Sequence, residues 1–588
     1  MNYPLEVPSN ADRSSGVEVI DDDKEKTCVS DAEISTKTLA AAVSADSVDD
    51  HSSRGIRGLF KLQKAELGED TEPKDSRTAS LKPRHLRMIA LGSGIGTGLF
   101  IASGNILKSG GPGSLLIGYI VMGAMVCCVV NALGEMCCMF PGKSSFSYYT
   151  RRFTDEASSF TQGVLYCCTA IVMFPAEITA AGFVAQHWQQ AQKFPTAGWM
   201  SVFFAFVVVI ACTGTRGYGE TEFLASMLKV AAVVIFFFTA IIINCGGAPK
   251  GGYIGLRYWH DPGAFNNGFK GFCSVFITAA FSLAGVEIIG IAAGQTKNPQ
   301  KAIPGALKRV FYRILGFFVI TLFIVSLNVA YNDSRLGTQS GFHNVTSPFI
   351  LAIQDGGIRV LPDIVNAVIL ISILSVANTS VFMASNTIYG MALSHQAPPV
   401  FTYVNKHGLP VVAVGLCFAF GFLAYVNTTK GGETLFSWLT NISGTASLLV
   451  WISLSYAHIR MRLAMRVQGV PDDIMPYRNR FGICASVFAI VINSLALIAQ
   501  IWIAIWPVGG AKPSANYFFE QVIGIPIGIA AWFGWLLCRR TGFPSLKDID
   551  LTTGRYDQGS DFDRETFNEK LHGDKPQTIR GRVYDFFC

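Results

Sequence analysis

Apolar residues fill most of the chain between about residues 85 and 540, in runs separated by short polar or basic loops. An apolar helix of roughly 17 residues or more is long enough to span a bilayer. Most of the runs pass this length, although the fourth is short. The pattern predicts an all-α polytopic membrane protein with twelve transmembrane helices, at 88–108, 112–138, 161–187, 199–213, 223–245, 271–294, 307–331, 364–390, 410–427, 434–458, 482–506 and 517–538.

Composition supports a membrane protein with polar ends. Of the 588 residues only 15% are charged, whereas soluble domains carry about 25%. The formal net charge of +6 is modest and gives no case for a nucleic-acid partner. Residues 1–80 are polar and poor in aromatic residues, a composition that cannot bury enough apolar surface to fold alone. We therefore expect a disordered cytosolic tail at 1–80, a twelve-helix domain at 81–540 and a second cytosolic tail at 541–588.

Basic residues predict the orientation of these segments. An even number of segments places both termini on one side of the membrane, and positive residues favour the cytosolic side. No apolar signal-peptide region opens the chain, so the first segment is expected to direct insertion. Asn332 and Asn344 then fall in an outer loop, either as glycan acceptors or as unmodified asparagines. The loops on the side of the termini hold most of the Lys and Arg residues, among them Arg151, Arg152, Lys308, Arg313 and Arg460.

The first membrane segment contains the unusual stretch LGSGIGTGLFIAS at 91–103. Glycine weakens a helix by about 1 kcal/mol relative to alanine, so four glycines at alternate positions predict a break near the middle of the membrane. Backbone groups freed by a break are tolerated in lipid only where they line a cavity. Beside the N-terminus of a half-helix they can bind a small anion such as a carboxylate. The alternative is an unbroken glycine-rich face that packs against another helix.

A second interrupted segment lies far downstream, at 276–295, where Ala284 and Gly285 precede Glu287. A central glutamate costs about 2.5–3.5 kcal/mol on membrane-insertion scales, so we expect it to face the protein interior. The interrupted segments are the first and the sixth. If segments one to five and six to ten form two repeats, the breaks occupy corresponding positions, which indicates a transporter binding site. Five segments in each half imply that the repeats are inverted.

Several fragments together resemble one family, the fungal amino-acid permeases of the amino acid–polyamine–organocation superfamily. They lie in family order and spacing across roughly residues 81–588. The resemblance implies a leucine-transporter-like fold, with a 5+5 inverted repeat plus two helices, and proton-coupled uptake at the plasma membrane. The fragments are LKPRHLRMIALGSGIGTGLFIASG (81–104), GGPGSLLIGY (110–119), ALGEM (132–136), FSLAGVEIIGIAAGQTKNPQKAIP (281–304), SPFILAIQDGGIRVLPDIVNAVIL (347–370), SNTIYGMAL (385–393) and MPYRNRF (475–481).

The resemblance implies a backbone-built substrate site at the two breaks. Backbone N–H groups of the first break would bind the substrate carboxylate, and carbonyls of the sixth segment would receive its ammonium group. Phe281 would lie over the substrate as a gate, with ordinary packing as the alternative. The residues concerned are Ser93, Gly94, Gly96 and Thr97 for the carboxylate, Ala279, Ala280 and Phe281 for the ammonium group, and Ala284 and Gly285 for the substrate side chain.

Three ionisable residues inside membrane segments match family positions. Glu287 and Lys229 would carry the proton, acting together, with Glu287 alone as the simpler option. The alternatives are a structural hydrogen-bond role for Glu287 and a Lys229 side chain that reaches the cytosolic edge. Glu177 would contribute to the substrate pocket or only to helix packing. Glu135, near the inner end of the second segment, is expected to be structural.

The chain departs from the family pattern within the expected pocket. It has GSGIGTG where many relatives have GGTIGTG, and FSLAGVE where relatives often have FSFGGTE, so that Val286 replaces a hydroxyl residue. These changes leave the identity of the substrate undetermined, but they do not affect the assignment to amino-acid transporters. We expect neutral or broad-range L-amino acids, because Glu177 and Glu287 would repel a second carboxylate.

Other chemistry has no motif to support it. The 14 cysteines lie mostly in membrane segments and form neither a disulfide nor a zinc framework. No nucleophilic triad or phosphate loop is present, so we expect no enzyme, cofactor or metal site. The final Cys588 resembles a palmitoylated family position, with a free thiol as the alternative. Lysines on the tails are candidate modification sites, and ubiquitin-ligase adaptors are candidate partners there.

The interpretation is a secondary active amino-acid importer driven by the proton gradient. It would work by alternating access around the two breaks, with segments three, eight and ten closing the site. A transporter of another amine, such as choline or a polyamine, is the first alternative. A nutrient receptor that no longer transports is the second, and an integral-membrane enzyme is the third.

Overall fold

The computed structural model describes residues 62–64, 83–140, 146–293, 299–336, 347–405, 408–428, 432–510, 512–539 and 542–555. The chain divides into two compact units, Met1–Lys61 and Leu62–Cys588, of which only the second contains described residues. The tail predicted at 1–80 therefore lies outside the described residues except for 62–64. Asn344 and Cys588 lie outside them as well.

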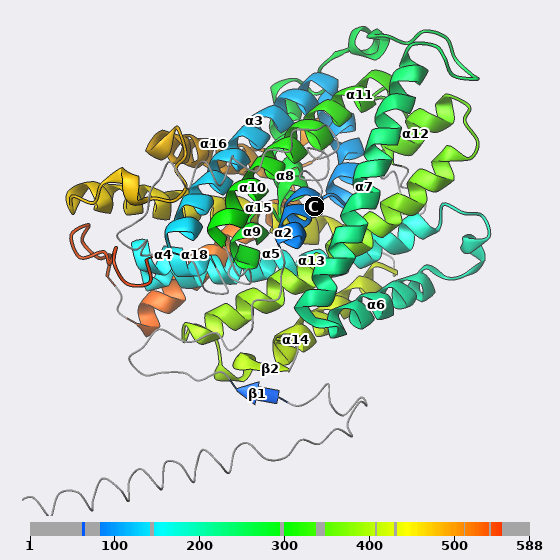
Figure 1. Ribbon diagram of the computed structural model, residues 1–588. Helices are drawn as coiled ribbons and strands as arrows, with labels where there is room; N and C mark the ends of the chain where they lie inside the picture. The colour runs from blue at the N-terminus through cyan, green and yellow to red at the C-terminus, as the bar shows by residue number, and fades with distance from the viewer. Residues whose placement is uncertain are drawn as a thin grey trace, which may run out of the picture. The chain divides into compact units, whose positions relative to one another are not determined.

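The described part of the chain is almost entirely helical (Figure 1). Short π- and 3-10-helical pieces, η2 (Gly98–Ala102), η5 (Ile314–Ile320) and η8 (Phe422–Thr428), continue some of the α-helices. The α-helices are α2 (Pro83–Gly92), α3 (Ser103–Met139), α4 (Ser147–Phe153), α5 (Glu156–Ala185), α6 (Thr196–Cys212), α7 (Gly214–Asn244), α8 (Gly268–Leu283), α9 (Ile288–Ala293), α10 (Pro299–Arg313), α11 (Thr321–Asn328), α12 (Pro348–Asp355), α13 (Leu361–Leu393), α14 (Val411–Gly421), α15 (Gly432–Val467), α16 (Gly482–Ile505), α17 (Ala515–Val522) and α18 (Gly524–Cys538).

The described helices include eight stretches that are long and apolar enough to cross a membrane. A ninth is the pair α17 and α18, which is bent by 62° at a short break. Thr196–Cys212 and Val411–Val426 are shorter apolar helices. Helical residues occupy each of the twelve predicted segments, so the prediction of a helical, multi-pass membrane protein is confirmed.

The first two predicted segments meet within α3, at a kink. Gly111 has φ 80° and ψ 172°, which is not a helical conformation, and Pro112 follows it. Glycine adopts positive φ readily, and proline has no backbone N–H to continue the helix. The loop before α8 satisfies the freed groups, because Asn266 N–H donates to the Gly110 carbonyl (2.9 Å) and Gly113 N–H donates to the Ala264 carbonyl (2.7 Å).

Burial separates inner helices from peripheral ones. The buried share of the most apolar stretch of each helix differs widely. It is 78% in α5, in α8 with α9, and in α13, but only 28% in α16. Helices α6 and α16 lie at opposite edges of the bundle (Figure 1). Exposed Phe206 and Phe238, on α6 and α7, are typical of a lipid-facing surface. The second predicted break therefore lies in one of the most buried stretches, and the first adjoins η2 and α3, where the corresponding share is 61%.

Two segments within the predicted tails contact the rest of the described chain. Strand β1 (Leu62–Lys64) pairs antiparallel with β2 (Tyr403–Asn405) in the region where we expected a disordered tail. Residues 542–555 contact the ends of α4 and α15, because Arg152 donates to the Asp550 carbonyl (2.8 Å) and Arg460 donates to the Pro544 carbonyl (2.5 Å). The predicted second tail is thus attached to the helices at least to residue 555.

Candidate functional site

The two predicted helix breaks exist and lie against each other. Helix α2 ends at Gly92 and η2 begins at Gly98, while α8 ends at Leu283 and α9 begins at Ile288. A Cβ atom added to Gly285 would lie 4.0 Å from the backbone nitrogen of Gly94. The Ser93 hydroxyl donates to the Gly285 carbonyl at 3.4 Å. The structure therefore brings Ser93, Gly94 and Gly285 together.

The first break is built from close backbone contacts. Gly94 has φ 79°, a left-handed conformation that favours glycine, and its added Cβ would lie 2.6 Å from the Ala284 carbonyl oxygen. An added Cβ on Gly96 would lie 2.7 Å from Val376 Cγ2. Real Cβ atoms do not approach other atoms this closely. The alternation of glycines therefore reflects a break held against its neighbours, in agreement with the sequence prediction.

Two buried cations hold the end of α2. Lys229 Nζ on α7 donates to the Gly92 carbonyl at 3.0 Å. Arg313 at the end of α10 donates to the Ala90 carbonyl (3.3 Å) and to the Ser93 carbonyl. The last carbonyls of a helix lack intrahelical partners and carry a partial negative charge, which favours cations. Lys229 thus contacts the first break, and its side chain is completely buried among the helices.

The position of Arg313 differs from the one expected from the sequence. We counted it among the basic residues of an inner loop, but its side chain is completely buried beside the first break. Its Nε and Nη2 atoms have no hydrogen-bond partner among the residues that the structure describes. The signal was present, because Arg313 lies six residues inside the predicted segment 307–331.

Lys229 has a carboxylate partner that the sequence analysis missed. Glu222, two turns earlier on α7, places its Oε1 3.6 Å from Lys229 Nζ, and both side chains are buried. Ser375 on α13 bridges them, because it accepts from Lys229 Nζ at 2.9 Å and donates to Glu222 Oε2. The spacing of seven residues, which repeats the same helix face, could have indicated this pair.

Glu177 lies at the N-terminal end of η2. The Thr97 hydroxyl donates to Glu177 Oε2. An added Cβ on Gly96 would lie 3.7 Å from the same oxygen. A helix N-terminus attracts negative charge through its free N–H groups. The end of η2 that we predicted to bind a carboxylate is therefore already occupied on one side by a buried protein carboxylate.

Glu287 stabilises the second break. Its Oε1 accepts from the Gly285 N–H at 3.2 Å and its Oε2 accepts from Trp451 Nε1 on α15 at 3.3 Å. Both Glu287 and Lys229 are buried, but these contacts are made to different partners. The structure thus shows each of the two predicted proton carriers at a helix break, one break each.

The end of α8 presents the carbonyls that we predicted for the ammonium group. The Ala284 N–H donates to the Ala280 carbonyl (2.9 Å) and to the Phe281 carbonyl (3.3 Å). Each carbonyl oxygen has a second lone pair and can accept one more donor. Ala279 and Ala280 are completely buried, and because an alanine side chain has no polar atom, only their carbonyls are candidates for this role.

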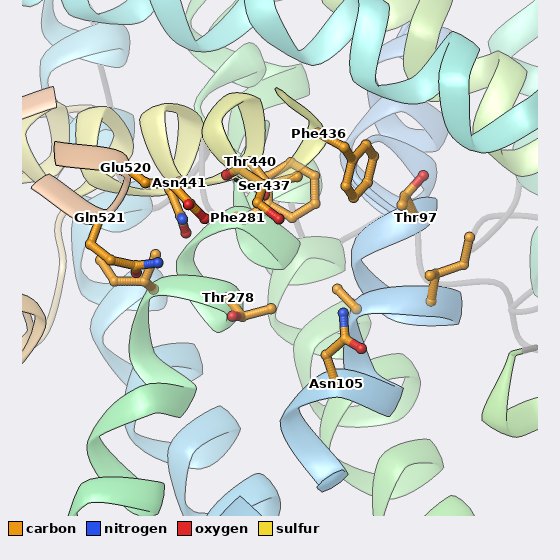
Figure 2. A pocket seen from close by; sticks show the side chains of 13 residues that line it. Thr97, Asn105, Thr278, Phe281, Phe436, Ser437, Thr440, Asn441, Glu520 and Gln521 are labelled. Carbon is orange, nitrogen blue, oxygen red and sulfur yellow. Dashed lines mark hydrogen bonds between the residues drawn. The ribbon is translucent and has the colours of Figure 1, made fainter. Parts of the chain in front are cut away.

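Phe281 lies between a small apolar cluster and a polar cavity. It packs with Met173, Ala284 and Val376 in the cluster. The cavity has a volume of about 180 Å³ (Figure 2). Of the twelve predicted site residues only Thr97 and Phe281 line it. The complete lining is Thr97, Ile101, Ala102, Asn105, Ile277, Thr278, Phe281, Phe436, Ser437, Thr440, Asn441, Glu520 and Gln521.

A separate ionic cluster surrounds Glu135. Its Oε2 lies 2.6 Å from His458 Nε2, and Arg462 donates to both carboxylate oxygens at 2.7 and 2.8 Å. The Asn479 N–H, within the fragment MPYRNRF, donates to Oε1 at 2.5 Å. The cluster joins α3, α15 and the loop before α16, which is consistent with the structural role predicted for Glu135. In the described ranges no group of three His, Cys, Asp or Glu side chains could hold a metal ion.

Comparisons with known proteins agree on one family. The family model described as "Amino acid permease" matches residues 85–548. The amino-acid permease 1 of Schizosaccharomyces pombe is 48% identical over 477 residues, which cover 81% of this chain and 79% of that protein. The general amino-acid permease of Saccharomyces cerevisiae is 39% identical over 86% of this chain and 85% of that protein.

A solved structure, the manganese transporter of Eremococcus coleocola, is similar at a TM-score of 0.49 and 14% identity, over 80% of this chain and 98% of that one. A likeness at this level indicates neither a substrate nor a mechanism. The family match and the two permeases, at 48% and 39% identity over most of both chains, are decisive. The resemblance found in the sequence is thereby confirmed: the chain belongs to the amino acid permease family of membrane transporters.

Proposed function

We propose that this protein is a proton-coupled importer of neutral or broad-range L-amino acids in the plasma membrane. The observation that carries the proposal is the contact between the two helix breaks, Ser93–Gly285 and Gly94–Ala284. One break offers the N-terminal end of a half-helix and the other offers carbonyls at a helix end. An amino acid carries the two complementary charges on one carbon atom.

The substrate carboxylate would bind the backbone N–H groups between Gly94 and Thr97, because that end of η2 favours an anion. The ammonium group would bind the carbonyls of Ala279, Ala280 and Phe281. Gly285 leaves space for a side chain, since an added Cβ there has no neighbour closer than 4.0 Å. The Thr97 hydroxyl, which donates to Glu177, would either contact both Glu177 and the substrate carboxylate or turn from Glu177 to the substrate.

The proposed architecture has twelve spans, a leucine-transporter-like 5+5 inverted repeat plus two helices, and both termini in the cytosol. The helical counterparts of all twelve predicted segments support this architecture. The breaks in the first and sixth segments support the repeat, because they occupy equal positions in the two halves. Ubiquitin-ligase adaptors remain proposed partners of the tails.

Proton coupling needs a group whose protonation differs in free energy between the outward and inward states. Lys229 contacts the Gly92 carbonyl of the first break, and Glu287 contacts the Gly285 N–H of the second. Loss or gain of a proton at either side chain would change a hydrogen bond at a half-helix end. We propose that these two residues couple the proton, with Glu222 as the immediate partner of Lys229 and Glu177 as the remaining candidate.

Uptake of radiolabelled amino acids by permease-deficient fungal cells tests the proposal. We expect concentrative uptake that rises as external pH falls and that a protonophore abolishes. Cells that express Gly96→Val at equal surface abundance serve as the matched control. Uptake of choline or a polyamine without amino-acid uptake would favour the first alternative, and surface binding without uptake would favour a receptor.

A further inference from the structure

The polar cavity beside Phe281 extends away from the helix breaks. It touches the proposed substrate site at Thr97 and Phe281 and continues to Asn105 on α3 and Glu520 on α17. In Figure 2, Phe281 lies between Thr97 and the neighbouring pair of Asn441 and Glu520. A water molecule needs roughly 10–15 Å³ of such volume, so about 180 Å³ is enough for an organic solute.

The cavity wall carries a negative charge without a positive side chain to balance it. Glu520 is the one ionisable side chain in the lining, and the lining contains no Lys, Arg or His. Glu520 is half-buried and makes no hydrogen bond or ion pair with any residue within the described ranges. A partly buried carboxylate without a partner is unfavourable, and a cation that enters the cavity would compensate it.

The wall that carries Glu520 is anchored. The neighbouring Gln521 accepts at its side-chain oxygen from Gln500 Nε2 on α16 at 2.5 Å. Thr445 on α15 donates to the Gln521 carbonyl at 3.4 Å. The bend of 62° between α17 and α18 leaves α17 as a separate short helix beside α15. Glu520 therefore projects from a backbone that two helices hold in place.

The remaining lining suits the solvation of an amine. Asn105, Thr278, Thr440 and Asn441 supply amide and hydroxyl oxygens, and Phe281 and Phe436 supply aromatic rings. Ammonium groups bind to carboxylate and carbonyl oxygens and to aromatic faces. An anion would meet the Glu520 carboxylate and no positive side chain in this cavity.

We propose that this cavity is an access subsite that binds the amino group of a solute through Glu520 before the solute passes Phe281 to the helix breaks. The ligand class is a primary ammonium or guanidinium compound, and a carboxylate on it is not required. The inference rests on the proposed function in one respect, namely that the site at the breaks takes an amino acid.

An amine without a carboxylate separates the two sites. Agmatine lacks the anion that the first break is proposed to bind, but it retains cationic groups for Glu520. In wild-type cells we expect agmatine to raise the KM for labelled leucine and to leave the maximal rate unchanged. Higher ionic strength should weaken this inhibition, because partly exposed charge pairs are screened by salt.

Substitutions then test Glu520 directly. Glu520→Gln should raise the inhibition constant of agmatine by up to about fivefold, the upper end of the effect of one partly exposed charge pair, and Glu520→Asp should retain inhibition. Asp363→Asn is the matched control, since it removes an exposed carboxylate outside the cavity lining. Asn441→Asp adds a second carboxylate to the lining and should strengthen inhibition, which keeps the test decisive if Glu520→Gln fails to reach the surface.

Equal inhibition by agmatine in wild type, Glu520→Gln and Asn441→Asp would overturn the access subsite while leaving amino-acid uptake intact. Absence of leucine uptake in wild-type cells would instead overturn the proposed function. Agmatine that is itself accumulated by wild-type cells and not by Glu520→Gln would support the subsite and extend the substrate range to amines.

Discussion

The two helix breaks are built in opposite ways. Buried cations, Lys229 and Arg313, hold the first break at the end of α2. A carboxylate, Glu287, holds the second break. At the first break an added methyl group at Gly96 would lie 2.7 Å from Val376, whereas at the second an added methyl at Gly285 would have no neighbour closer than 4.0 Å.

This difference indicates that the two breaks contact different parts of the substrate. A tightly packed break can present backbone N–H groups at fixed positions, which suits a group common to all amino acids. A break with free space beside it can accommodate side chains of different size. We therefore expect substitutions at the first break to affect all substrates and substitutions at the second to discriminate between them.

The largest effect is expected for Gly96→Val. The new side chain would collide with Val376 and occupy the approach to the N-terminal end of η2. Uptake of every amino acid should vanish while the protein still reaches the surface, as measured by surface biotinylation and labelled uptake. Val376→Ala makes room, so the milder pair Gly96→Ala with Val376→Ala should recover part of the uptake that Gly96→Ala alone loses. Normal uptake by surface-expressed Gly96→Val would contradict the carboxylate assignment.

The next effect concerns the cation that holds the first break. Lys229→Met leaves Glu222 buried without its charge partner, and breaking a buried pair costs about 3–5 kcal/mol. We expect a lower thermal unfolding temperature in detergent and less protein at the surface. Lys229→Met combined with Glu222→Gln removes both charges and should restore surface abundance without restoring concentrative uptake. If the single and double variants are equally unstable, the 3.6 Å pair does not stabilise the fold.

Glu287→Gln tests the corresponding group of the second break. The amide oxygen can still accept from the Gly285 N–H or from Trp451, so the expected loss of stability is small. The variant should bind substrate and exchange internal for external substrate, yet lose accumulation against a gradient and its pH dependence. Wild-type accumulation and pH dependence in both Glu287→Gln and Lys229→Met would show that the proton site lies elsewhere.

Distance along the chain explains part of what the sequence analysis predicted and part of what it missed. The first break was predicted from a local glycine pattern and the second from Ala284, Gly285 and Glu287 inside an apolar run. The helical membrane class was predicted from apolar runs of ordinary length. Glu222 as the partner of Lys229 was missed, although the two residues lie on one helix. The contact of Glu287 with Trp451 joins positions 164 residues apart, which no local periodicity reveals.

Arg313 shows a different limit of the sequence analysis. A cation near the end of an apolar run looks the same whether it faces the cytosol or a helix terminus. Only the packing of α10 against α2 places it beside the Ala90 carbonyl. The resemblance to the permeases supplied the site residues, and the comparisons confirmed the family without testing those residues one by one.

Competition between substrates tests whether Glu177 lies beside the substrate carboxylate at the N-terminal end of η2. Glu177 lies against Thr97, and Glu287 lies at the opposite break, so a second carboxylate on the substrate would be repelled. Leucine and phenylalanine should inhibit labelled uptake more strongly than glutamate at equal concentration. Stronger inhibition by glutamate would contradict the placement of Glu177 beside the substrate.

The smallest and most selective effect is expected at Gly285. Its φ of 88° makes an alanine strained by about 1–2 kcal/mol, although the surrounding space would accept the methyl group. That space is the one proposed for the substrate side chain, so Gly285→Ala should raise the KM for phenylalanine about five- to tenfold, which corresponds to about 1.0–1.4 kcal/mol. The KM for glycine and alanine should change little, because these substrates do not fill the space. An equal rise for glycine and phenylalanine would mean that the strain disturbs the whole site, and the two breaks would then not differ in the way that their packing indicates.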